Sequence, residues 1–75
     1  MDKTRYQIHK RCGTLERLRG DEISRLIAKT YPLSTQIALL MDKDMKPEEF
    51  KEYLKFREEC KGAVDLELRR LSEEP

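Results

Sequence analysis

The sequence predicts an all-α protein that folds as one domain. Charged residues make up 41% of the 75 residues and hydrophobic residues 37%, with only three glycines and three prolines, a composition typical of helical bundles and coiled coils. Hydrophobic residues also recur three, four or five positions apart through most of the chain, as on one face of an amphipathic helix. Because so short a chain has room for one core, residues 1–75 are expected to form a single helical domain.

The first long helix is predicted over about residues 3–30. Gly13 and Gly20 interrupt it, and each costs about 1 kcal/mol relative to alanine inside a helix. One continuous, imperfect helix is favoured over two shorter helices, the second capped by Asp21, because the apolar stripe stays in phase across both glycines. Pro32 ends the helix, since the residue before a proline is displaced from the α region. The stripe consists of Ile8, Cys12, Leu15, Leu18, Ile23, Leu26 and Ile27.

A short helix is predicted over about residues 35–42, with Ser34 as its N-cap. Its large apolar residues are Ile37, Leu39, Leu40 and Met41. Isolated helices shorter than about 12 residues are marginal in water. This segment is therefore expected to be packed against the rest of the protein.

A second long helix is predicted over about residues 47–71. Pro47 suits the first helical position, and Glu48 and Glu49 complement the positive end of the helix dipole. Because the connection is short, the two long helices must run antiparallel and form a helical hairpin. The stripe of the second helix consists of Phe50, Tyr53, Leu54, Cys60, Val64, Leu68 and Leu71.

The hairpin buries only one seam against its first helix, and a core of this size brings little net stability. Oligomerisation, or docking on another protein, is therefore expected to complete the fold. Four hydrophobic residues outside the stripes are predicted to form a second contact face, because contiguous apolar patches mark interaction sites. The alternative is that they are scattered exposed hydrophobic residues of the ordinary kind. The seam comprises Phe50, Tyr53, Leu54, Val64 and Leu68, and the second face comprises Leu39, Phe56, Ala63 and Leu66.

The net charge of +1 is unevenly distributed. Residues 1–30 hold eight Lys and Arg against four Asp and Glu, giving +4, and residues 31–75 hold eight against eleven, giving −3. The two halves can attract each other within a monomer or between copies. A basic first helix also allows nucleic-acid binding, but the acidic residues at the start of the second long helix would face the phosphates, so nucleic acid is not the favoured partner.

His9 and Cys12 lie three positions apart and are neighbours on one helix face, as a nucleophile and its base would be. No glycine-rich turn and no set of metal ligands accompanies them. The glutamates of residues 48–59 alternate with lysines, as on a solvated face. The sequence therefore predicts no enzyme activity, no catalytic residue, no metal or other cofactor and no small-molecule substrate.

Cys12 and Cys60 have no metal-binding spacing, and so few cysteines favour a reducing compartment. A disulfide between them stays possible if the long helices lie antiparallel. The N-terminal residues have no signal-peptide core, and no run of 18 apolar residues occurs. A soluble protein is expected, without membrane insertion or secretion by a signal peptide.

Residues 31–61 read YPLSTQIALLMDKDMKPEEFKEYLKFREECK. This segment resembles a pattern in small helical proteins of tailed bacteriophages and prophages. The features that carry the resemblance are the tyrosine at its start, the apolar Ile-Ala-Leu-Leu turn, the Lys-Pro-Glu-Glu-Phe motif and the Cys-Lys pair. Pro32, the Leu33-Ser34 order and Met41 depart from that pattern. The resemblance implies a tail or late structural protein, in the cytoplasm of a bacterial host or in the virion. Its implied role is assembly with, or attachment to, other virion or host proteins. Together with the self-association expected from the small core, this makes further copies of the chain or a phage structural protein the expected partners.

The predicted function is therefore that of a non-enzymatic protein–protein interaction or assembly protein, encoded by a phage or prophage. Two alternatives stay open. The chain could be a small regulatory or inhibitory protein that binds a host factor, or a nucleic-acid-binding accessory protein that uses its basic first helix.

Overall fold

The computed structural model describes residues 1–74, and every regular element in this range is a helix. The prediction of an all-α protein is thus confirmed. The four helices are α1 (Lys3–Cys12), α2 (Leu15–Thr30), α3 (Leu33–Met41) and α4 (Pro47–Glu73). Together they form a rod of 49 × 18 × 17 Å.

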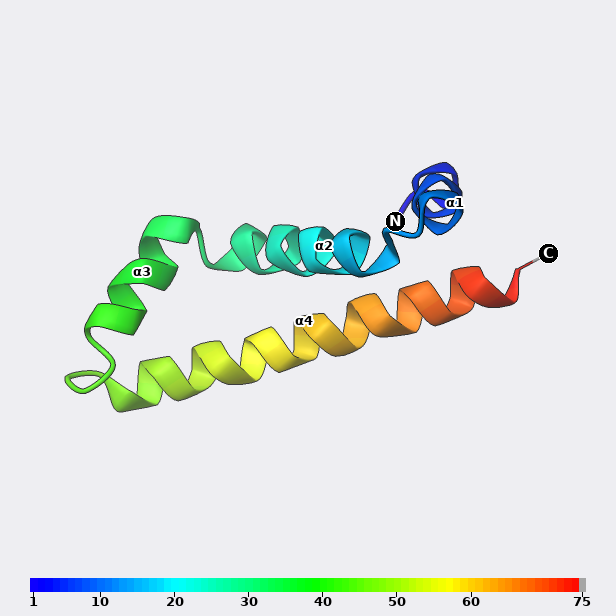
Figure 1. Ribbon diagram of the computed structural model, residues 1–75. Coiled ribbons are helices and arrows are strands. Elements are labelled where there is room, and N and C mark those ends of the chain that lie inside the picture. The colour runs from blue at the N-terminus through cyan, green and yellow to red at the C-terminus, as the bar shows by residue number, and fades with distance from the viewer. Residues whose placement is uncertain (75) are drawn as a thin grey trace.

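Helices α2 and α4 lie side by side and run in opposite directions, and they form the body of the rod (Figure 1). Helix α1 crosses this pair at the end where α4 finishes, and α3 closes the other end (Figure 1). The first arm of the predicted hairpin is therefore two helices set at an angle to each other.

The prediction of one continuous helix over residues 3–30 is wrong at Gly13. This residue has a φ of 72°, in the left-handed region that glycine adopts without a steric penalty. The Gly13 N–H donates to the Lys10 carbonyl (3.3 Å) and the Thr14 N–H to the His9 carbonyl (2.9 Å), which satisfies two of the last carbonyl groups of α1. Gly20, by contrast, lies inside α2 without interrupting it.

The helix boundaries that were predicted from prolines agree with the structure, unlike the continuity predicted across Gly13. Helix α2 ends at Thr30, just before the Tyr31-Pro32 pair, and Pro47 is the first residue of α4. The predicted N-cap of the short helix is wrong, because Pro32 occupies the cap position and Ser34 already lies inside α3. A proline can precede a helix without loss, since its missing N–H would have no intrahelical acceptor there.

Two hydrophobic clusters follow each other along the rod. The central cluster joins α2 to α4, and the α1 cluster joins α1, α2 and the last turns of α4. Met1 and Leu68 pack against both clusters. The buried residues are Ile23, Ile27, Tyr53, Cys60 and Val64 in the central cluster, and Tyr6, Leu18 and Leu71 in the α1 cluster.

Leu54 was predicted in the seam, and this placement is wrong, because its residue surface is 42% exposed. Successive helix residues are about 100° apart around the axis, so a stripe centred on Tyr53 leaves Leu54 on the flank. In the first arm, Ile8 and Cys12 are exposed, while Tyr6, which lies outside the predicted stripe, is buried.

Charges from the basic and acidic halves of the chain pair on the rod surface. Two hydrogen bonds join the Arg19 guanidinium to the Asp65 carboxylate, at 2.5 and 3.1 Å, and Lys3 Nζ lies 3.4 Å from a Glu74 carboxylate oxygen. The hydrogen bonds from Arg19 lower the pKa of Asp65 below its ordinary value. Exposed pairs of this kind are screened by solvent and contribute little to stability, so they support the packing without determining it.

Candidate interaction surface

Helix α3 packs on the rod with its less apolar side. It has nine residues, none of them charged, and none is buried. Thr35, Ala38 and Leu39 face the start of α4, where they line a shallow depression with Lys46 and Glu49. Leu39 also packs against the central cluster.

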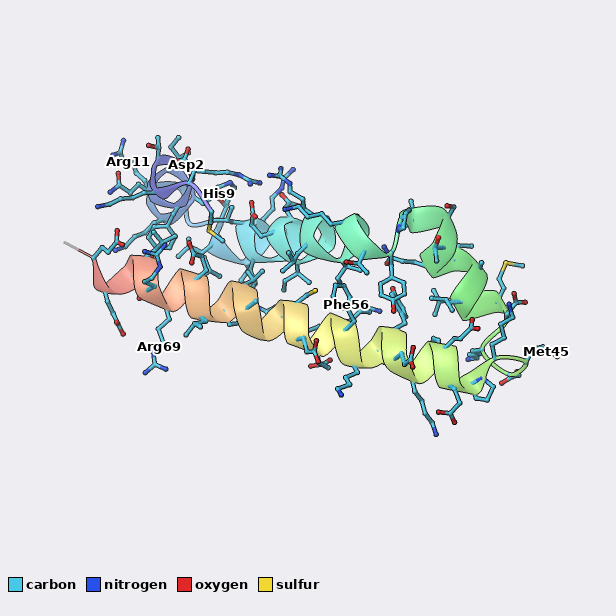
Figure 2. All side chains as sticks on the ribbon, turned by 180° about the vertical axis from the view of Figure 1, so that it is seen from behind. Asp2, His9, Arg11, Met45, Phe56 and Arg69 are labelled. Carbon is cyan, nitrogen blue, oxygen red and sulfur yellow. The ribbon has the colours of Figure 1, made fainter. Side chains whose placement is uncertain are left out.

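The opposite side of α3 is exposed and apolar. Leu33, Ile37, Leu40 and Met41 are 69%, 50%, 50% and 80% exposed, and their spacing of four, three and one places them on one helix face. Met45, 83% exposed, lies in the turn that follows, at the outer end of the molecule (Figure 2). These five residues are called the α3 surface below.

The α3 surface is large for so small a protein. The exposed surface of its five residues sums, with their backbone, to on the order of 600 Å², at the upper end of the range of about 300–600 Å² for the largest apolar patch on a typical monomer, which is often functional.

A partly buried pair of hydrogen bonds through Gln36, called the α3 relay below, fixes the orientation of α3. The Gln36 side-chain amide donates to the Tyr31 carbonyl (2.7 Å), and the Tyr53 hydroxyl donates to the Gln36 side-chain oxygen (2.7 Å). The Tyr31 ring packs edge-on against the Tyr53 ring, with the centroids 5.1 Å apart, and also contacts Phe56. Because Gln36 is bonded to the residue that caps α2 and to Tyr53 of α4, α3 is held with its apolar side outward.

The four residues predicted as a second contact face do not lie together. Leu39 and Phe56 are half-buried and pack against the central cluster, so neither is free to form a separate face; Phe56 is labelled in Figure 2. Ala63 is exposed and lines a shallow groove between α2 and α4. Leu66 is 69% exposed and lies near Arg69, which points away from α2 (Figure 2).

The sequence did contain a signal for the α3 surface. Residues 33–41 have no charged side chain in a chain that is 41% charged, and apolar residues occur on both sides of the short helix. The expectation that this helix must be packed was right for one side only. A helix of nine residues between two longer ones offers one side to the core, and the other side then has no intramolecular partner.

His9 has a structural role at the end of α1. His9 Nδ1 lies 2.7 Å from the Thr14 hydroxyl oxygen, so the imidazole braces the turn at Gly13 (Figure 2 labels His9). Cys12 and Cys60 are free thiols, the first exposed and the second buried. Burial raises the pKa of the Cys60 thiol.

Within residues 1–74, no group of three His, Cys, Asp or Glu side chains is arranged to hold a metal ion. None of the helices in this part of the chain has the length and apolar character needed to cross a bilayer. Comparison of the chain with family models, with curated proteins and with solved structures gives no match.

Proposed function

We propose that this protein is a non-enzymatic assembly protein that contacts another protein through the α3 surface. The observation that carries the proposal is an uncharged helix held with its apolar side outward. Interface cores are depleted in charged residues and enriched in methionine, and the α3 surface has both properties. Exposed apolar patches of this size are also a known mark of interaction sites.

The spacing of the exposed residues supports a helix-in-groove mode of binding. Leu33, Ile37, Leu40 and Met41 occupy the i, i+4, i+7 and i+8 positions, which are the anchors of an amphipathic helix laid against an apolar groove. The two methionines suit this role because their flexible thioether side chains adapt to irregular surfaces. The rest of the rod then acts as a rigid body that carries the contact.

The phage or prophage origin is part of the same proposal. The resemblance over residues 31–61 spans α3, the following turn and the first half of α4, although two residues of the α3 surface, Leu33 and Met41, depart from its pattern. A phage structural protein is the partner class that this resemblance supports, beside further copies of the chain.

Nucleic-acid binding receives less support from the charges. Arg5 pairs with Glu22 and Arg19 with Asp65, so some of the basic side chains of the first two helices are already matched by carboxylates of the same molecule. Neutralised side chains release few counterions from a phosphate backbone, and that release drives non-specific binding.

The experiment places a photoreactive benzoylphenylalanine at Met41 in producing cells. We expect covalent adducts of defined mass that decrease when Ile37→Glu is added, and binding that is reproduced with the purified captured protein. The same probe at Glu58, an exposed polar position of α4, is the matched control. Equal labelling at the two positions, or adducts unaffected by Ile37→Glu, would refute the proposed function.

A further inference from the structure

We propose that the occupant of the α3 surface is a second copy of this chain, bound about a two-fold axis so that two rods join end to end. The inference rests on the proposed function and names its partner. Three features carry it: the area of the surface, its lack of charge, and its position on the rod.

The first feature is area. On the order of 600 Å² is exposed at the five residues of the α3 surface, so a contact that covered all of it on both copies would bury at most about 1,200 Å². Stable protein–protein interfaces bury about 1,200–2,000 Å² in total. Two α3 surfaces therefore supply most of the area that a stable dimer needs, and the adjoining residues of the turn around Met45 supply the rest.

The second feature is charge. A two-fold contact brings the same patch of each copy together, so a charged patch would repel itself. Leu33–Met41 contains no charged side chain, and the four charged residues around Met45 (Asp42, Lys43, Asp44 and Lys46) are two acidic and two basic, so the α3 surface can face its own copy without a net repulsion. In an antiparallel pairing of two α3 helices, the positive dipole end of each also lies near the negative end of the other.

The third feature is position. Helix α3 closes the end of the rod that is remote from α1 (Figure 1), and Met45 lies in the turn at that outer end (Figure 2). Copies joined at this end extend the long axis. A dimer so formed approaches twice the 49 Å length of one rod at nearly unchanged width, with α1 at each far end. A dimer joined along α4 would instead keep the length and increase the width.

Sedimentation velocity over a roughly hundredfold range of concentration, combined with small-angle X-ray scattering of the purified chain, tests the inference. We expect a monomer–dimer equilibrium and a maximum dimension that nearly doubles as the dimer forms. Leu40→Glu should abolish the dimer, because the contact would bury two unpaired carboxylates. Leu66→Glu is the matched control, an equally acidic change at an exposed leucine of α4, and should leave the dimer intact. Circular dichroism verifies that both variants fold.

The outcomes separate this inference from the proposed function. A chain that stays monomeric at every concentration, but still forms specific adducts from Met41 with another protein, overturns the second copy as partner and leaves the proposed function standing. A dimer with the length of one rod, or one lost with Leu66→Glu and kept with Leu40→Glu, overturns the end-to-end arrangement. Absence of both the dimer and the adducts overturns the proposed function as well.

Discussion

Replacing Gly13 and Gly20 by alanine should change the stability of this protein in opposite directions. Gly13 has a φ of 72°, and an alanine held in the left-handed region costs about 1–2 kcal/mol. The unfolded chain loses freedom on the same replacement, which offsets about 0.4–1 kcal/mol. Gly13→Ala should therefore lower the free energy of unfolding by about 1 kcal/mol. Gly20 lies inside α2, and a Cβ there would meet nothing within 4 Å, so Gly20→Ala should raise it by about 1 kcal/mol.

Urea denaturation followed by helical circular dichroism measures the difference. The two variants should differ by about 2 kcal/mol, or about 1–2 M in the urea midpoint for a slope of about 1–2 kcal/mol per molar. All proteins are compared at one concentration, because self-association makes apparent stability depend on concentration. Gly62→Ala is a further control: Gly62 lies inside α4 with open space around it, and alanine there should also stabilise. If Gly13→Ala stabilises as much as Gly20→Ala, α1 and α2 form one helix and the break is wrong.

Three further predictions concern the core, the α3 relay and the surface charges. Leu18→Ala should lower the free energy of unfolding by about 2–5 kcal/mol because Leu18 is fully buried, whereas Leu54→Ala should lower it by about 1 kcal/mol or less. Urea denaturation in the presence of a stabilising osmolyte measures both variants. Equal losses would show that Leu54 belongs to the core. Tyr53→Phe should lower the free energy of unfolding by about 1 kcal/mol, because it removes the hydroxyl that bonds to Gln36 of α3. Amide hydrogen exchange should become faster in α3 more than in α2. Unchanged exchange in α3 would contradict the relay. Asp65→Asn should lower the Tm slightly at neutral pH. Because Arg19 lowers the pKa of Asp65, the stabilisation is present above the ordinary carboxyl pKa of about 3.9 and is lost as pH falls through the lowered value, so the Tm difference should close in acid; a constant difference would exclude the ion pair as its cause.

Local rules were sufficient for the helix ends at prolines. Pro32 displaces the residue before it from the α region, and Pro47 fits the first helical position, whatever surrounds them. Local rules do not distinguish Gly13 from Gly20. Both are single glycines in a helical pattern, and only one breaks the helix. The difference is tertiary, since the turn at Gly13 accompanies the packing of Tyr6 in the α1 cluster, which periodicity within one helix does not encode.

The sequence predicted that the protein has an interaction surface, but it did not identify the residues of the α3 surface. An interaction surface was expected, but Leu39 and Phe56 lie against the central cluster. The centre of a helical stripe shifts by about 100° with a one-residue change of register, so the difference between flank and core depends on where the partner helix lies. The α3 surface was missed because the relay through Gln36, a single polar residue, determines which side of an apolar helix turns inward.

The arrangement of the two hydrophobic clusters gives the rod a modular stability. Met1 and Leu68 are the side chains that pack against both clusters, so each end is held largely by its own set of contacts. Proteins open locally in cooperative units that follow such divisions. The end that carries α3 can therefore open locally while the α1 end keeps its packing. For the same reason, substitutions on the α3 surface can change its binding preference without a change in the packing of the α1 cluster.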